Sequence, residues 1–269
     1  MNYRHAFHAG NFADCVKHAL LLWCLRAMQR KAAGVFVLDT HAGIGRYDLS
    51  GDEARRTGEW HDGIGRLLDQ PPALLAEYVT LAARDLYPGS PTLLRAIMRP
   101  VDRLACCELH PADAATLRHR FARDSHTAIH QRDGYEAIAA LLPPRGLRRA
   151  LVLIDPPYER EHEAQLVAAA LATANARMPG ATLLAWYPIK HRAPVRALQA
   201  AITPRDAWAA ELWLRAPLDP ARLNGCGLIV VNPPFGFAAE AGPILEALLG
   251  RLGSGDPGQG RAITRLTAE

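Results

Sequence analysis

Two patterns of apolar and polar positions alternate along the chain. Short apolar runs rich in β-branched residues predict buried strands, and longer runs with apolar residues three or four apart predict helices. Strands are expected at 35–39, 104–109, 127–131, 151–154, 181–187, 209–215 and 227–231, with an edge strand near 262–266. Helices are expected at 12–30, 112–123, 134–142 and 162–177. The pattern indicates an α/β fold with a doubly wound, mostly parallel sheet and an antiparallel C-terminal hairpin.

One stretch interrupts this alternation. Residues 49–86 contain two helical segments separated by Pro71 and Pro72, with no convincing strand. We therefore expect a small helical insertion at 49–86 within a core made of 1–48 and 87–269. In the core, Asn11 is the expected N-cap of the first helix.

Composition and charge exclude several classes of protein. The 269 residues are 49% hydrophobic and 22% charged, as expected of a globular enzyme. The net charge of +4 is compatible with a polyanionic partner but does not require one. No apolar run reaches the roughly 18 residues that span a membrane, and the first residues lack the apolar core of a signal peptide. We therefore expect a cytoplasmic protein with no membrane partner.

Neither the cysteines nor the N-terminal histidines predict a metal centre. The five cysteines include no Cys-x-x-Cys pair, which argues against a zinc site and against a disulfide framework. His5, His8 and His18 lack a partner carboxylate in a metal-binding pattern. We expect no metal and, because no clear apolar patch stands out, a monomer.

The most informative segment runs from Asp155 to Tyr158. Asp155 follows a strand expected to be buried on both faces, and Pro156 and Pro157 end that strand because they donate no ladder hydrogen bond. The carboxylate is thereby held at the carboxyl end of a core strand, where open α/β sheets bind ligands. Asp155 and the Pro156 carbonyl can accept the two N–H groups of an adenine amine, and Tyr158 can stack on the base, worth about 1–3 kcal/mol. This predicts chemistry on an extruded base; the alternative is a plain turn capped by Asp155.

A glycine turn and two acids follow other predicted strands. Gly43 and Gly45 come after Asp39, and such a turn lets the backbone approach a ligand closely. The G-x-G-x-x-G fingerprint is absent, which disfavours nicotinamide nucleotides. Glu108 can accept two ribose hydroxyls and Asp133 an adenine amine, although each alone is as readily a cap or turn residue. Together with the Asp155 segment, this order predicts a site for S-adenosylmethionine at the switch point of the sheet.

Several longer motifs occur in the order of a known family. They are YRHAFHAGN at 3–11, DTHAG at 39–43, RTGE at 56–59, YPGSP at 87–91, ELHP at 108–111, DG at 133–134, IDPPY at 154–158, WYP at 186–188 and NPP at 232–234. On these motifs the chain resembles, essentially end to end, the bacterial 23S ribosomal RNA adenine-N6 methyltransferases of the J type.

The resemblance implies a Rossmann-like class I methyltransferase that uses S-adenosylmethionine to methylate the N6 amine of a specific adenine in 23S ribosomal RNA. Asp155, Pro156 and Tyr158 would form the catalytic corner, with Asp155 as the proton acceptor. Tyr3 would touch the RNA or close over the cofactor, and the inserted helices would help to grip the RNA. The residues implied to bind the cofactor are His18, His41, Gly43, Ser90, Glu108, Asp133 and Gly134.

Other readings stay open beside this one. A DNA adenine-N6 methylase, or a non-enzymatic RNA-binding protein on the same fold, would share much of the pattern. Asn232-Pro233-Pro234 resembles a second amine-binding motif, which we expect to end the terminal strand hairpin and to line the pocket. The arginines within 118–123 and 145–149 are candidates for phosphate contacts.

Overall fold

The computed structural model describes residues 4–82 and 86–268, and their main feature is one eight-stranded sheet. Its strand order is β10-β8-β9-β7-β6-β1-β4-β5, with parallel pairing from β7 to β5 and antiparallel pairing from β7 to β10. The predicted mostly parallel sheet with an antiparallel C-terminal part is confirmed. The strands are β1 Phe36–Asp39, β4 Arg103–Glu108, β5 Thr127–Gln131, β6 Ala150–Ile154, β7 Thr182–Ile189, β8 Ala207–Trp213, β9 Gly225–Val231 and β10 Gly260–Arg265.

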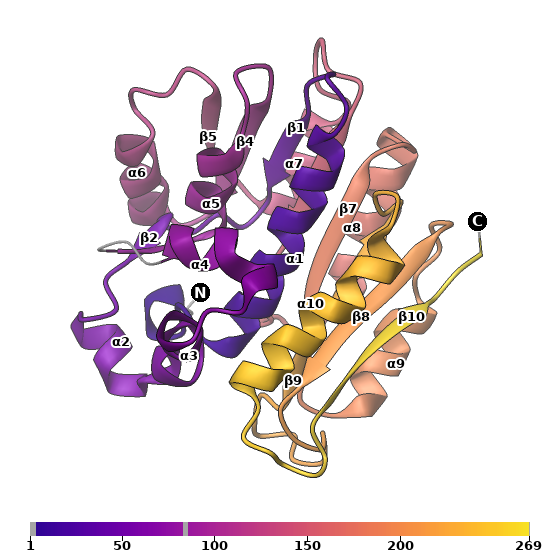
Figure 1. Cartoon of the computed structure of the whole chain (residues 1–269). Helices are drawn as coiled ribbons and strands as arrows, with labels where there is room; N and C mark the ends of the chain where they lie inside the picture. The colour runs from indigo at the N-terminus through magenta and orange to yellow at the C-terminus, as the bar shows by residue number, and fades with distance from the viewer. Residues whose placement is uncertain (1–3, 83–85, 269) are drawn as a thin grey trace.

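Helices cover both faces of this sheet (Figure 1). Each face has its own hydrophobic cluster, and β6 contributes Leu151 and Leu153 to one cluster and Val152 and Ile154 to the other. Because both faces of β6 are buried, all of its residues are apolar. The first cluster includes α1 (Phe12–Gln29), α5 (Ser90–Ile97), α6 (Pro111–Arg120) and α10 (Phe237–Leu252), and the second includes α7 (Gly134–Leu141), α8 (Glu163–Arg177) and α9 (Arg192–Ala200).

Helix α1 begins where the sequence predicted. The Asn11 side chain accepts a hydrogen bond from the Asp14 backbone N–H at 3.0 Å, as an N-cap does. A short 3-10 turn, η1 (His5–Phe7), precedes it. The N-terminal segment therefore reaches the carboxyl-end edge of the parallel strands in an ordered conformation.

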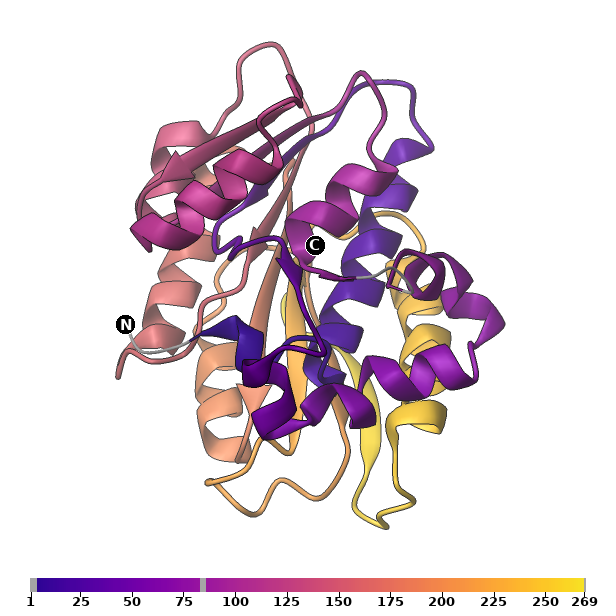
Figure 2. The same cartoon turned by 90° about the vertical axis from the view of Figure 1, so that its left-hand side faces the viewer.

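The stretch expected as an insertion is helical, with more elements than the two predicted segments. It contains α2 (Asp52–Thr57), η2 (Glu59–Asp62), α3 (Ile64–Asp69), η3 (Ala73–Leu75) and α4 (Ala76–Ala82). A two-stranded antiparallel ladder, β2 (Arg46–Tyr47) with β3 (Tyr87–Pro88), joins its two ends. Helices α3 and α4 contact α10 and α1, so the insertion packs on the core (Figure 2). Its separation as a unit of its own stays a prediction.

The expectation that Asn232-Pro233-Pro234 lines the pocket is wrong. The motif follows β9, but β9 runs antiparallel to β7, and its last residue Val231 pairs with Leu183 near the start of β7. The motif therefore lies at the sheet edge opposite the carboxyl ends of the parallel strands, and it is not among the residues that line the cleft described below. The Asn232 side chain donates to the Pro179 and Ala181 carbonyls at 2.8 and 3.0 Å, which is a structural role.

Candidate active site

The Asp155 corner lies at the carboxyl end of β6, as predicted. Tyr158 has a positive φ of 54°, a conformation that side chains other than glycine rarely adopt and that often marks functional sites. Its hydroxyl donates to the Trp186 carbonyl at 3.2 Å, and the two rings meet edge to face with centroids 5.7 Å apart. Because β6 and β7 are in register at Ile154 and Ala185, Trp186 lies beside Asp155. The corner is thus a rigid slot with a carboxylate at one end and aromatic walls.

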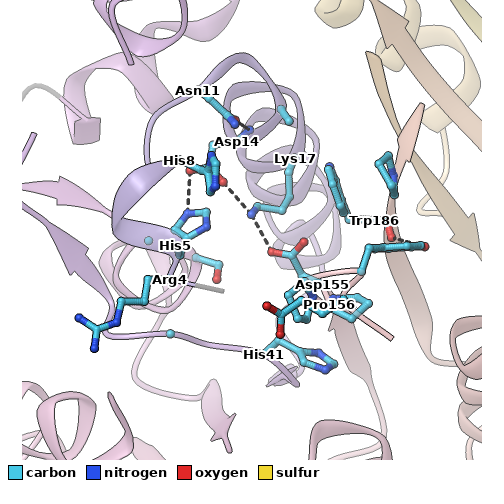
Figure 3. A pocket seen from close by; sticks show the side chains of 18 of the residues that line it. Arg4, His5, His8, Asn11, Asp14, Lys17, His41, Asp155, Pro156 and Trp186 are labelled. Atoms are coloured by element: carbon cyan, nitrogen blue, oxygen red, sulfur yellow. Dashed lines mark hydrogen bonds and ion pairs between the residues drawn. The ribbon is translucent and has the colours of Figure 1, made fainter. Parts of the chain in front are cut away.

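Lys17 on α1 joins this corner to the N-terminal segment (Figure 3). Its Nζ lies 2.6 Å from Asp155 Oδ2 and 2.7 Å from Asp14 Oδ1, and His5 Nε2 lies 2.9 Å from Asp14 Oδ2. Burial alone would lower the pKa of the Lys17 ammonium, but the two carboxylates hold that pKa well above its usual value. A permanent positive charge therefore faces Asp155.

Sequence reasoning assigned no role to Lys17, Asp14 or Trp186. The one available signal was a lysine three residues after an aspartate on a helix whose neighbouring positions are apolar. Such a pair is usually a solvated ion pair, whereas here both side chains are buried. A buried ion pair needs further partners, and Asp155 is the partner that Lys17 finds.

The glycine turn after β1 is tied to the end of β4. Gly43 has a φ of 61°, and its N–H donates to Glu108 Oε2 at 2.9 Å. The other carboxylate oxygen of Glu108 accepts from the His110 N–H at 2.8 Å. Each carboxylate oxygen has a second lone pair, so Glu108 keeps the capacity to accept hydroxyl donors from a ligand. Burial raises the pKa of this carboxyl.

Asp133 caps α7 by accepting from the Tyr135 N–H at 2.8 Å, and its Oδ2 pairs with Arg160 at 3.0 Å. A Cβ at Gly134 would lie 2.1 Å from the Thr40 carbonyl oxygen, so only glycine lets α7 begin this close to the β1 turn. His41 lies against Gly134 and its ring meets Tyr135 edge to face. Burial lowers the pKa of His41 to about 4, so the imidazole is neutral at pH 7.

Ser90, Asp39 and His18 lie behind the glycine turn. The Ser90 hydroxyl donates to Asp39 Oδ2 at 2.7 Å, and His18 Nδ1 lies 2.9 Å from the Tyr87 hydroxyl. Burial lowers the pKa of His18 to about 3 and raises the pKa of Asp39 to about 7. Asp39 Oδ1 is buried and has no hydrogen-bond partner among the described residues. Asp39 itself is fully buried and lies beneath the lining of the cleft, whereas Ser90 and His18 line it.

One cleft of about 1460 Å³ connects these groups. It exceeds the 300–1,000 Å³ of a typical small-molecule site, and is large enough for a cofactor and a nucleotide together. All the predicted site residues that the structure describes line it: His18, His41, Gly43, Ser90, Glu108, Asp133, Gly134, Asp155, Pro156 and Tyr158. The prediction for Tyr3 lies outside the described residues.

Within 4–82 and 86–268, no group of three or more His, Cys, Asp or Glu side chains is arranged to hold a metal ion. The helices in the same residues are all too short or too polar to cross a membrane.

The fold and this cleft define a class I methyltransferase that uses S-adenosylmethionine. Residues 32–263 match the family described as "Ribosomal RNA large subunit methyltransferase D, RlmJ", and the chain belongs to this family. This confirms the resemblance that the motifs carried.

Two curated relatives and one solved structure extend over nearly the whole chain. Proteins named "Ribosomal RNA large subunit methyltransferase J" are 37% identical in Haemophilus influenzae, covering 92% of both chains, and 35% identical in Escherichia coli, covering 94% of both. The crystal structure of protein LPL1258 from Legionella pneumophila superposes with a TM-score of 0.86 at 31% identity, covering 96% of this chain and 98% of that one.

Proposed function

We propose that this enzyme methylates the N6 amine of an adenine in 23S ribosomal RNA, and that it works in the cytoplasm where this RNA is found. The observation that carries the proposal is the slot formed by Asp155, Pro156, Tyr158 and Trp186, with Lys17 fixing the carboxylate. The names of the curated relatives support RNA of the large ribosomal subunit as the substrate.

The slot suits an aromatic amine, which is a poor nucleophile because its lone pair is delocalised into the ring. Two acceptors for its N–H groups favour a pyramidal nitrogen with a localised lone pair. Lys17 occupies Asp155 Oδ2, while Oδ1 accepts no hydrogen bond from a described residue. Asp155 Oδ1 is thus available for one N–H of the amine, and the Pro156 carbonyl for the other. The ring of Tyr158, fixed through its hydroxyl to Trp186, holds the plane of the base.

S-adenosylmethionine, which the residues around the glycine turn would hold, would supply an activated methyl group. The residues of this chain contribute alignment, which can lower the barrier by roughly 7–11 kcal/mol. Asp155 also receives the proton that the amine loses, and the Lys17 ammonium, 2.6 Å from Oδ2, holds the carboxylate in place. No covalent enzyme intermediate is required, which agrees with the burial of all five cysteines.

Asp155→Ala tests this role. It removes the acceptor and leaves Lys17 paired with Asp14, so we expect methylation of unmodified 23S RNA to be abolished, a loss of at least about 10²–10⁴-fold. Binding of S-adenosylmethionine, measured by calorimetry, should change little. Asp155→Asn, which keeps the shape and removes the charge, should also be strongly impaired. Wild-type turnover in Asp155→Ala would show that the assignment is wrong.

The choice of substrate needs its own measurement. Labelled methyl incorporation into naked 23S RNA, the assembled large subunit and duplex DNA separates an RNA enzyme from a DNA adenine methylase. Digestion and mass spectrometry then locate the mark on N6. RNA binding with no S-adenosylmethionine binding would instead indicate a non-enzymatic RNA-binding protein.

A further inference from the structure

The cleft continues beyond the Asp155 corner along β7. Side chains alternate between the two faces of a strand, and Trp186, Pro188 and Lys190 lie on the same side of β7 and its extension and all line the cleft. At about 3.3 Å per residue, Lys190 lies roughly 13 Å past Trp186. A polynucleotide whose base sits at Asp155 has a path along β7 to Lys190.

This path ends at a loop that carries two more cations. The loop, residues 214–224, joins β8 to β9 and is the orange segment at the bottom of Figure 2. Its residues Arg215 and Arg222 line the same cleft as Lys190. We call Lys190, Arg215 and Arg222 the basic wall.

One buried side chain holds this loop against the end of β7. Asn224 is fully buried, and its backbone N–H donates to the Ile189 carbonyl at 3.0 Å. Its Nδ2 donates to the Lys190 carbonyl at 2.7 Å and to the Asp219 carbonyl at 2.8 Å. The backbone around the basic wall is therefore fixed by main-chain and amide contacts, without an ion pair to its charged groups among the described residues.

The cations of the basic wall differ from Lys17 and Arg160 in having no acidic partner among the described residues. Lys17 and Arg160 are paired with Asp155 and Asp133. In the part of the chain that the structure describes, Lys190, Arg215 and Arg222 form no ion pair. The Arg215 guanidinium donates one long hydrogen bond, to the Leu223 carbonyl at 3.5 Å. Three positive charges are thus left for a partner from outside the chain.

The single acid in the loop does not neutralise them. Asp219 Oδ1 accepts from the Ala221 N–H at 2.9 Å, which is a turn contact. None of the acids that line the cleft lies in this loop: they are Asp14, Glu53, Glu59, Asp62, Glu108, Asp113, Asp133, Asp155, Glu159 and Glu163. A polyanion entering the cleft is therefore attracted towards the basic wall.

We propose that the basic wall binds the phosphates of the unpaired RNA strand that carries the target adenine into the cleft. This inference rests on the proposed function, because it takes RNA as the substrate. Phosphate contacts fix the position of a strand and carry no sequence information. The basic wall therefore supplies affinity and register, while selection of the base stays at the Asp155 corner.

The test compares two triple variants with the same net charge. K190Q/R215Q/R222Q removes the basic wall, and R30Q/R196Q/R205Q removes three exposed arginines outside the cleft, at the end of α1, on α9 and in the loop before β8. Each variant lowers the net charge from +4 to +1 (4 − 3). Any difference between them reports the position of the charges rather than their number.

Binding of unmodified 23S RNA, transcribed in vitro, is measured at several salt concentrations. Three lost phosphate contacts on a single strand make the slope of log K against log salt shallower by about 2, which corresponds to roughly 100-fold weaker binding at 0.1 M salt. The control variant should keep the wild-type slope. In turnover, the basic-wall variant should raise KM for RNA by a similar factor with kcat nearly unchanged, since these contacts are equal in ground and transition states.

The outcomes distinguish the two proposals. If the wild type methylates 23S RNA and the basic-wall variant matches the control variant in salt slope and KM, the basic wall does not bind RNA and this inference is overturned alone. If the wild type fails to methylate 23S RNA, the proposed function falls and this inference with it. Calorimetric binding of S-adenosylmethionine by both variants verifies that they are folded.

Discussion

The two sides of the cleft use their polar groups in opposite ways. On the insertion side, Glu59 accepts from His8 and Asn11, each at 3.0 Å, and the Thr57 hydroxyl donates to the Phe7 carbonyl. These contacts bind the insertion to the N-terminal segment. On the other side, Asn224 anchors the basic wall, whose cations have no acidic partner within residues 4–82 and 86–268.

This difference indicates that the insertion side is structural and that the opposite side binds a ligand. In the RTGE motif at 56–59, the Thr57 hydroxyl and the Glu59 carboxylate both form hydrogen bonds within the protein. Two arginines of the insertion are also paired, Arg55 with Asp52 and Arg66 with Asp62. We therefore expect the insertion to order the N-terminal segment over the cleft, and the basic wall to meet the RNA.

The largest effect should come from Gly63→Ala, at the closest contact between the insertion and the N-terminal segment. The added Cβ would lie 2.1 Å from the Gly10 carbonyl oxygen and 2.6 Å from a backbone carbon of Asn11. Neither is a flexible side-chain end, so we expect a loss of about 3 kcal/mol in the free energy of unfolding, measured in urea.

Gly180→Ala is the matched control, because a Cβ there meets nothing within 4 Å. It should change the free energy of unfolding by no more than about 0.5 kcal/mol. If Gly63→Ala keeps its stability and loses RNA affinity instead, the insertion also binds RNA, and the two sides of the cleft do not differ in role.

Asn224→Ala should have the next largest effect. The Lys190 and Asp219 carbonyls would lose their amide donor in a partly buried setting, at a cost of about 1–3 kcal/mol in the free energy of unfolding. Because the loop then loses its fixed position, KM for RNA should rise while the affinity for S-adenosylmethionine stays the same. A stability loss with an unchanged KM would mean that the basic wall needs no fixed geometry.

Much of this architecture could be predicted because apolar runs and chain breakers are local signals. The predicted strand bounds lie within two residues of the observed ones, and Asn11, Asp155 and the glycine turn were placed correctly from their immediate neighbours. The predicted site residues that follow strands, such as Glu108, Asp133 and Asp155, came together because parallel strands end at the same edge of a sheet.

What the sequence could not reveal depends on the direction of a strand or on distant contacts. Asn232 follows an apolar strand as Asp155 does, yet β9 runs the other way and carries the motif to the opposite edge. Lys17 and Asp155 are 138 positions apart, and no local pattern predicts their contact. The basic wall is likewise assembled from the end of β7 and a loop that antiparallel pairing brings beside it.

The smallest expected effect is a pH dependence confined to the insertion side, where His8 and Glu59 titrate as a pair. The hydrogen bond to Glu59 raises the pKa of His8, against the lowering effect of burial. Burial would raise the pKa of Glu59, but the hydrogen bonds from His8 and Asn11 hold it below its usual value. The stability from His8 is complete below its unfolded pKa of about 6.5 and is lost as pH rises through the higher folded pKa. The stability from Glu59 is complete above about 4.3 and is lost as pH falls through its lower folded pKa.

The difference in free energy of unfolding between the wild type and Glu59→Gln should therefore be largest near pH 5–6 and should shrink towards pH 8. Both side chains are more than a third exposed, so the increment should not exceed about 1 kcal/mol. The free energy of unfolding of both proteins is measured in urea at pH 5.5 and 8. Groups that titrate alike in both proteins cancel in the difference. A difference that grows towards pH 8 would contradict the pairing, and with it the view that the insertion holds the N-terminal segment through its charges.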